Sequence, residues 1–225
     1  MSAESDYLEH YNSDPRTAEE LIQIAHDSDS DPEVADGIYW EAVTILQHRL
    51  PTIIDRIRNL GGDDRFRELS ATVLGQNSVE CKVYAQECTD TLLTMLGSKA
   101  SVPVVISIAQ ALGHLRDPRA IEALVPLRTH HDPGVRQAIA FGLLFQEAPM
   151  AIDALVELTS DVDRGVRNWA TFGLAQCEVD TPAVREALAL RLSEEDEEIR
   201  GEAISGLSRR GDTRVVDLVK TDRAE

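Results

Sequence analysis

The chain has 225 residues, of which 43% are hydrophobic and 28% charged, enough for one ordinary domain or one row of short repeats. The 40 acidic residues outnumber the 22 basic ones, and the formal net charge is −18. A negative field of this size opposes binding to nucleic-acid phosphates and to anionic membranes, and it favours solubility and a basic partner. No run approaches the roughly 18 apolar residues of a membrane span.

The N-terminus and the cysteines point to a reducing compartment. The first ten residues, MSAESDYLEH, have no basic segment and no apolar core, so they do not resemble a secretion signal. The three cysteines, Cys81, Cys88 and Cys177, form no CxxC pair, and we expect reduced, buried thiols. We therefore expect a cytoplasmic protein. Residues 1–14 are polar and acidic, which predicts a flexible lead-in to a single repeat array over residues 15–225.

Helical patterns follow one another from residue 15 onward. Thr17 and Glu20 have the spacing of a capping box at the start of the first pattern, residues 15–27. The stretch 78–96 fits one long helix or two short ones, and both alternatives stay open. No alternating strand pattern appears, which predicts almost no sheet. The other predicted helices are 32–49, 50–60, 64–75, 118–128, 133–145, 149–158, 164–175, 182–192, 197–209 and 213–220.

One motif recurs along these helices. Residues 132–144, DPGVRQAIAFGLL, return as DRGVRNWATFGLA from Asp163 and as DEEIRGEAISGLS from Asp196. Fainter copies begin at Asp31, Asp63 and Ser101. The first apolar residue of each copy, here called position 0, recurs at intervals of 32, 38, 31, 31 and 33 residues, a period typical of one helix pair per repeat. These residues are Val34, Phe66, Val104, Val135, Val166 and Ile199.

The pattern D-P-x-V-R-x-x-x-A-x-x-x-L-G resembles the short HEAT-like repeats of the bacterial, phycobilisome-lyase-like type, from about Thr17 onward. The resemblance implies an all-α fold, a right-handed α-solenoid or superhelix of about six helical hairpins. Each hairpin is amphipathic, and stacking against its neighbours completes its core. The family includes scaffolds, adaptors, lyase subunits and enzymes, so the resemblance is specific for the fold and not for the function.

An arginine follows position 0 in four copies, at Arg67, Arg136, Arg167 and Arg200. In HEAT-like repeats this arginine commonly pairs with the loop aspartate of a neighbouring repeat, and an aspartate precedes position 0 by three residues in each of the last three copies. A row of arginines is also able to bind a phosphate or carboxylate ligand, and this alternative stays open. The resemblance implies a structural Asp–Arg ladder of Asp132, Arg136, Asp163, Arg167, Asp196 and Arg200.

Position 6 of the copies carries three large aromatic residues. At about 100° per residue it lies well away from the stripe formed by positions 0, 4 and 8, so we expect it to face a concave groove. Exposed apolar patches usually mark partner sites, although these aromatics are also able to pack against the next helix. Trp169, at position 3, is expected between repeats. The predicted partner-binding residues are Trp40, Phe141, Phe172, Asn168, Thr171 and Gln137.

Metal-binding and catalytic motifs are mostly absent. The sequence has no HExxH, no Walker A loop and no G-x-S-x-G, and we predict no metal site and no cofactor. His130 and His131 beside Asp132 are a candidate metal pair, although adjacent histidines in a turn are more often solvated. Asp27, with the aspartates at 29 and 31, alternates as in a calcium loop but lacks its glycine and distal glutamate.

We interpret the chain as a non-catalytic protein–protein interaction module. The second helices of the repeats would line a groove that binds a protein partner of basic or amphipathic character. A HEAT-like DNA-alkylation glycosylase is one alternative, with Trp40, Phe141, Phe172 and Trp169 against the damaged base, but the net charge has the wrong sign. A bilin lyase or isomerase subunit is another, on fold analogy alone. We expect neither a nucleic-acid nor a membrane partner.

Overall fold

The computed structural model describes residues 14–28, 37–58, 63–75, 83–97 and 99–215. All regular secondary structure in these ranges is helical, and they contain no strand. No helix among them is long and apolar enough to cross a membrane. The chain divides into two compact units, residues 1–117 and residues 118–225, called unit 1 and unit 2. The single array over residues 15–225 stays a prediction.

Several predictions concern residues outside these described ranges. The lead-in over residues 1–14 lies outside the described residues except for Asp14, and so do Cys81 and most of the predicted helix 213–220. Within 78–96, the description begins at Val83, which is helical, Tyr84 forms a turn, and the following helix begins at Ala85.

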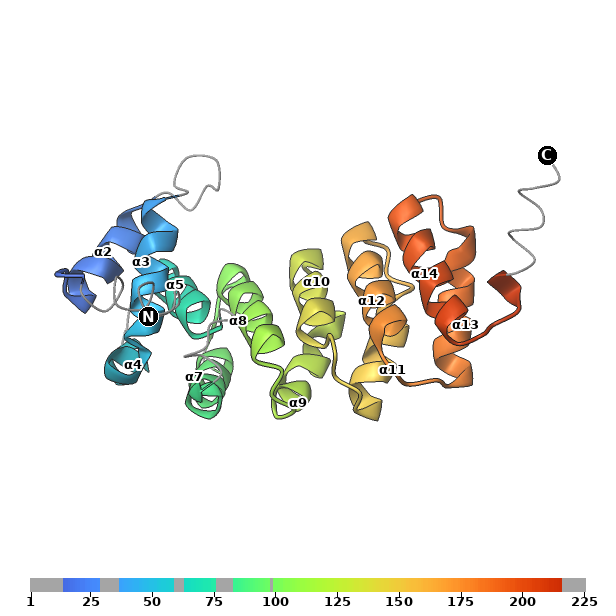
Figure 1. Cartoon of the computed structure of the whole chain (residues 1–225), viewed down its shortest axis with the longest axis horizontal. Helices are drawn as coiled ribbons and strands as arrows, with labels where there is room; N and C mark the ends of the chain where they lie inside the picture. The colour runs from blue at the N-terminus through green and yellow to red at the C-terminus, as the bar shows by residue number, and fades with distance from the viewer. Residues whose placement is uncertain (1–13, 29–36, 59–62, 76–82, 98, 216–225) are drawn as a thin grey trace, which may run out of the picture. The chain divides into compact units, whose positions relative to one another are not determined.

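Unit 1 is built from three helix pairs, each with a first and a second helix. The second helices α3, α5 and α8 lie side by side in the order in which they occur in the sequence, as Figure 1 shows. The predicted capping box is confirmed, because Thr17 accepts a hydrogen bond from Glu20 N–H and the Glu20 side chain accepts one from Thr17 N–H. The pairs are α2 (Ala18–Asp27) with α3 (Ile38–His48), α4 (Leu50–Arg58) with α5 (Asp64–Gly75), and α7 (Ala85–Gly97) with α8 (Val102–Leu115).

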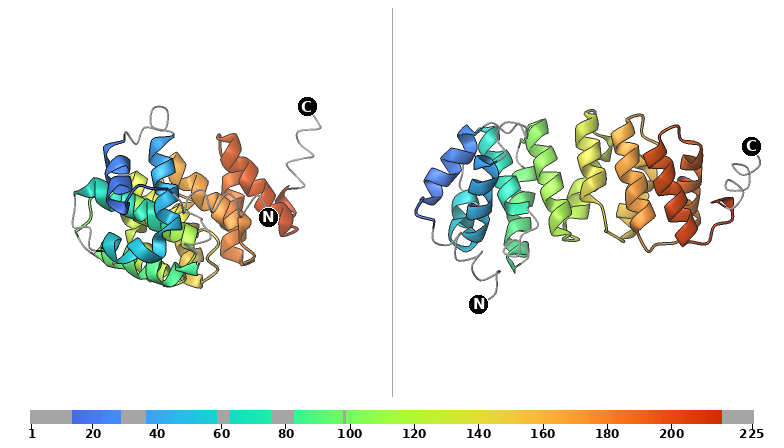
Figure 2. Two further views of the ribbon diagram at one scale, coloured as in Figure 1. Left: turned by 60° about the vertical axis from the view of Figure 1, so that its left-hand side comes forward. Right: turned by 45° about the horizontal axis from the view of Figure 1, so that its top comes forward.

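Unit 2 repeats this plan with three further pairs. The second helices α10, α12 and α14 lie side by side, and α9, α11 and α13 form the other layer (Figures 1 and 2). The predicted helix 118–128 turns into a 3₁₀ segment at Val125, next to Pro126, whose missing N–H interrupts α-helical bonding. The pairs are α9 (Ala120–Leu124) and η1 (Val125–Thr129) with α10 (Pro133–Gly142), α11 (Pro149–Leu158) with α12 (Arg164–Gln176), and α13 (Pro182–Leu190) and η2 (Arg191–Ser193) with α14 (Glu197–Arg209).

The repeat motif explains where the second helices of unit 2 begin. In each, an aspartate side chain accepts a hydrogen bond from the backbone N–H of position 0: Asp132 from Val135 at 3.2 Å, and Asp163 from Val166 at 3.1 Å. Asp196 caps α14 in the same way. Such caps satisfy N–H groups that have no partner inside the helix. The aspartates of the motif are therefore helix N-caps.

The predicted apolar stripe forms the core of unit 2. The residues at positions 0, 4 and 8 of α10, α12 and α14 have no accessible surface. This periodicity is that of one buried helix face, and the prediction is confirmed. The nine residues are Val135, Ile139, Leu143, Val166, Ala170, Leu174, Ile199, Ala203 and Leu207.

Glycine allows neighbouring second helices to approach closely. A Cβ atom added at Gly206 of α14 would lie 2.9 Å from the Cα atom of Ala175 in α12. A Cβ atom at Gly75 of α5 would overlap Ala111 of α8. Position 7 of one repeat thus meets position 9 of the repeat before it at both places, and this contact fixes which sides of the helices face each other.

Helix α10 ends earlier than predicted. It was expected to reach residue 145, but its last residue is Gly142. Phe145 has a φ angle of 61°, in the left-handed region, which cannot continue a right-handed helix. The residue that corresponds to Phe145 in α12 is Gln176, and it remains helical. The difference places an aromatic side chain at the end of α10.

Candidate functional site

Four aromatic side chains of unit 2 form a continuous series of ring contacts, which we call the aromatic cluster. The rings of Phe141 and Trp169 are 5.1 Å apart between centroids and nearly perpendicular, at 87°. Trp169 meets Phe172 at 6.0 Å, and Phe172 meets Phe145 at 6.5 Å, both again edge to face. This geometry is favourable because the positive edge of one ring points at the negative face of the next.

The cluster lies between the core and the solvent. Phe141, Trp169 and Phe172 are half-buried, and Phe145 is 45% exposed. Phe141 and Phe172 occupy position 6, which the helical periodicity turns away from the buried stripe. The two predicted aromatics are therefore not sealed in the core. The sequence analysis did not single out Phe145. This residue lies at position 10 of the copy that contains Phe141, four residues or about one helical turn later, and that spacing could have indicated it.

The other predicted contact residues have different surroundings. Trp40 is 43% exposed at the start of α3 and packs edge to face on Tyr39, but it belongs to unit 1. Gln137 and Asn168 are half-buried on the second helices of unit 2. The Gln137 side chain lies over Gly165, where an added Cβ atom would come within 2.5 Å of its Oε1.

Thr171 is wholly buried and offers no surface to a partner. It lies one turn before Ala175, on the side of α12 that packs against α14. Its hydroxyl oxygen and Asn168 Oδ1 are both buried without a hydrogen-bond partner. The surface that remains consists of the aromatic cluster with Gln137 and Asn168.

The repeat arginines are paired, but not with the predicted aspartates. Arg136 donates from Nε and Nη2 to Asp161, at 2.7 and 2.8 Å, rather than to Asp163. Arg167 donates to Glu194 at 2.7 and 3.1 Å, rather than to Asp196. The predicted partners were therefore wrong. In both pairs the arginine binds the acidic residue two positions before the N-cap aspartate of the next second helix.

The three repeat arginines of unit 2 also close the loops before their own helices. Arg136 Nη1 donates to the carbonyls of His130 and His131, at 2.9 and 3.2 Å. Arg167 and Arg200 make the same two contacts in the following copies. The guanidinium of Arg136 also keeps the pKa of Asp161 below its usual value, because it donates hydrogen bonds to the ionised carboxylate. These bonds give the arginines a structural role.

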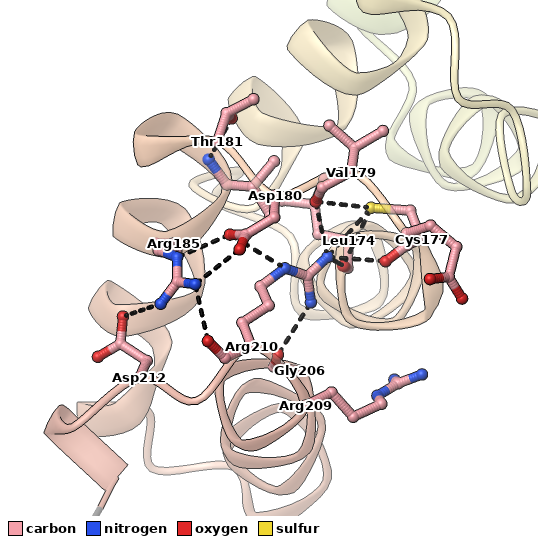
Figure 3. Close-up of polar contacts among 12 residues, drawn as sticks. Leu174, Cys177, Val179, Asp180, Thr181, Arg185, Gly206, Arg209, Arg210 and Asp212 are labelled. Carbon is pink, nitrogen blue, oxygen red and sulfur yellow. Dashed lines mark hydrogen bonds and ion pairs between the residues drawn. The ribbon is translucent and has the colours of Figure 1, made fainter.

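A second arginine network closes the C-terminal end of α12 (Figure 3). Arg210 follows α14, and its Nη2 donates to the carbonyls of Leu174, Cys177 and Val179, at 2.9, 2.8 and 2.9 Å. The same nitrogen lies 3.3 Å from the sulfur of Cys177. The side chain of Arg210 is only 6% exposed. This guanidinium therefore supplies hydrogen bonds to carbonyls that the end of a helix leaves unpaired.

Nothing in the described part of the chain forms a metal site. No group of three histidine, cysteine, aspartate or glutamate side chains in it is arranged to hold an ion. His130 Nδ1 instead lies 3.1 Å from the backbone nitrogen of Asp132, inside the turn that precedes α10. The rings of His130 and His131 are tilted against each other, with centroids 4.3 Å apart.

Solved structures resemble the chain in fold. The Escherichia coli protein YibA matches with a TM-score of 0.69 and 23% identity, over 98% of this chain and 80% of its own. A designed armadillo repeat protein in complex with the peptide (KR)4 matches with a TM-score of 0.56 and 15% identity, over 92% and 99%. A structure of Kap95p with RanGDP matches with a TM-score of 0.61 and 16% identity, over 98% of this chain and 35% of the other.

No curated protein matches the chain, and these comparisons give no support to the glycosylase or lyase alternatives. The family model for HEAT repeats matches residues 50–144, 89–175 and 152–222. HEAT and armadillo-like repeats generally mediate protein interactions. The repeated D-x-x-V/I-R motif, the paired helices and this match agree, and the chain belongs to the HEAT repeat family.

Proposed function

We propose that this chain is a protein-interaction module that binds a segment of a partner protein over the aromatic cluster of unit 2. The observation that supports the proposal best is the ring series Phe141, Trp169, Phe172 and Phe145, partly accessible on adjacent second helices. Aromatic side chains are enriched at protein interfaces, because they bury a large area with few rotatable bonds. Gln137, half-buried one turn before Phe141, adds an amide near the rings, and an amide suits the backbone of an extended segment.

The expected partner segment is basic or amphipathic. The net charge of −18 attracts cationic chains and repels anionic ones. The designed armadillo protein with a similar fold holds the alternating basic peptide (KR)4, and Kap95p was solved with a protein partner. An amphipathic basic segment would place its apolar residues on the rings and its charges toward the acidic surroundings.

The test begins with affinity capture from the source cell, using the wild-type chain and the variants Phe141→Ala and Phe172→Ala as baits. Any captured protein is then purified, and its affinity is measured for each bait. If the cluster is the contact surface, each substitution weakens binding by about 1–3 kcal/mol while the chain still unfolds cooperatively.

Val162→Ala is the matched control, because Val162 is 92% exposed in the loop before α12 and makes no part of the cluster. This variant should bind like the wild type. A partner whose affinity is the same for all four chains would place the contact surface elsewhere. Equal losses of folding stability and affinity in the Phe141 and Phe172 variants would assign the rings to the core.

A further inference from the structure

A bulky aromatic residue lies in a left-handed conformation just beyond the end of α10. Arg116 after α8 and Gly211 after α14 also have positive φ angles, of 55° and 62°, whereas Cys177 after α12 is extended. Phe145 adopts a left-handed backbone conformation, with a φ angle of 61°, and its ring is 45% exposed. Bulky side chains rarely take this conformation, and residues that do so often lie at functional sites. The conformation directs a large apolar ring to the surface, edge to face against Phe172.

Two carboxylates lie next to this end. Glu147 follows Phe145 by two residues, and Glu178 has the same position in the next repeat. The side chain of Glu147 accepts a hydrogen bond from the backbone N–H of Glu178, at 3.1 Å, so the two glutamates are neighbours in space. Both are exposed. An aromatic ring and two carboxylates thus face solvent at the same end of the cluster.

The next repeat shows which chemical group binds at the corresponding helix end. At the end of α12, the guanidinium of Arg210 binds the carbonyls of Leu174, Cys177 and Val179 (Figure 3). The residue that corresponds to Arg210 in the preceding copy is Cys177, which carries no charge that could serve the end of α10. The carbonyl end of a helix is partially negative and favours a cation.

We infer that the end of α10 is an arginine-binding site, in which a guanidinium of the partner segment stacks on Phe145 and pairs with Glu147 and Glu178. The inference rests on the proposed function and names the residue type that the partner supplies. Arginine suits the site better than lysine, because a planar guanidinium stacks on an aromatic ring and donates in parallel to a carboxylate.

The test uses the full chain and two synthetic peptides of equal length and charge, which alternate alanine with arginine or with lysine. Dissociation constants are measured by calorimetry at physiological ionic strength, for the wild type, Phe145→Ala and Glu147→Gln. We expect the arginine peptide to bind more tightly than the lysine peptide, and each substitution to weaken it by roughly threefold to tenfold.

Glu122→Gln is the matched control, because it removes one exposed glutamate on α9, away from the cluster. It should change the affinity by less than Glu147→Gln does. The amide introduced by Glu147→Gln keeps an oxygen that accepts the Glu178 N–H, so this variant tests the charge without removing that contact. Circular dichroism of each variant checks that the fold is kept.

Three results would overturn the inference: no measurable binding of the arginine peptide, equal affinities for both peptides, or equal effects of Glu147→Gln and Glu122→Gln. None of these would overturn the proposed function, which depends on the captured partner and on Phe141 and Phe172. If that partner loses affinity with Phe141→Ala but not with Phe145→Ala or Glu147→Gln, the interaction surface stands and the arginine site is excluded.

Discussion

Arg136 of α10 and Asp161, which lies ahead of α12, form a bidentate ion pair across two adjacent repeats. The Nε–Oδ2 distance is 2.7 Å and the Nη2–Oδ1 distance is 2.8 Å. Only 12% and 10% of the two side chains are exposed. Asp161 also accepts a hydrogen bond from the backbone N–H of Asp163, so a single carboxylate links the loop before α12 to α10. The stability of unit 2 should therefore be sensitive to either partner of this pair.

Replacing Arg136 with lysine should destabilise the chain by about 1–3 kcal/mol, because an ammonium cannot form both hydrogen bonds and leaves a shielded carboxylate partly unpaired. The measurement is the free energy of unfolding in urea. Arg164→Lys is the control, since Arg164 also pairs with an aspartate of the next repeat, Asp196, but is 60% exposed. That variant should unfold like the wild type. A loss of the same size in both variants would contradict the role assigned to burial.

The stabilisation from Asp161 should depend on pH with a defined sign. Its folded-state pKa is lowered by the hydrogen bonds from Arg136, so the ionised carboxylate favours the folded chain. The contribution is complete above the unfolded pKa of about 3.9 and is lost as the pH falls through the folded pKa.

The Asp161→Asn substitution tests this sign. The variant should be less stable than the wild type at neutral pH, and the gap between the two should narrow as the pH falls below about 4. Urea unfolding across this range measures the gap. A gap that stays constant would mean that the stabilisation comes from packing rather than from the charge.

Two glycines of α14 should respond to alanine with opposite signs. Gly206→Ala should destabilise the chain by about 1–3 kcal/mol, because the new methyl group would overlap α12 at Ala175 and force the helices apart. Gly201→Ala should stabilise it by about 0.4–1 kcal/mol, because nothing lies within 4 Å of its Cβ position and alanine restricts the unfolded chain. Thermal unfolding of the two variants would show the contrast. A stabilised Gly206→Ala variant would refute the close approach of α12 and α14.

Because Phe145 has a left-handed conformation, two substitutions at this position should differ in their effect on folding stability. Phe145→Gly and Phe145→Ala both remove the ring and its contact with Phe172, but only glycine takes a φ angle of 61° without steric strain. We expect the glycine variant to be the more stable by about 1 kcal/mol. The comparison of their urea midpoints is internally controlled, since both lack the side chain. An alanine variant of higher stability would show that the residue is not held in this conformation.

Two neighbours in α12 should differ in how much stability they contribute. Leu174→Ala should destabilise the chain by about 2–5 kcal/mol, because Leu174 has no accessible surface and its loss leaves a cavity. Phe172→Ala should be less damaging, because the ring is half-buried and its neighbours in the aromatic cluster are able to close over the space. Chemical denaturation measures both. Equal losses would assign Phe172 to the core and remove it from the proposed contact surface.

Local sequence signals predicted the helices well. The Asp–Pro–Gly start of the motif, the apolar residues at positions 0, 4 and 8, and the Thr17 capping box all act within one or two turns of a helix. Their outcome therefore depends little on the rest of the chain. The predicted helix 197–209 matches α14 at both ends, because Asp196 caps its start.

The errors concern contacts between elements. The sequence placed an aspartate and an arginine at a regular spacing, but nothing local says that Asp163 uses its carboxylate for its own helix and leaves Arg136 to Asp161. Thr171 appeared on the outer arc of a helical wheel, yet it has no accessible surface. It lies one turn before Ala175, which meets Gly206 of α14. A helical wheel describes the faces of a single helix, whereas the burial of a side chain depends on the helices that pack against it.

The amino-acid sequence by itself determined the repeat, its period, the helix starts and the buried stripe, because each of these follows from backbone hydrogen bonding and side-chain spacing inside a single helix. The tertiary structure decided which carboxylate each arginine binds, where α10 ends, and that Phe145 joins Phe141, Trp169 and Phe172 in one cluster. These features depend on how closely adjacent helices approach, and that distance is fixed by small residues such as Gly206, whose contact Ala175 lies a full repeat away in the sequence.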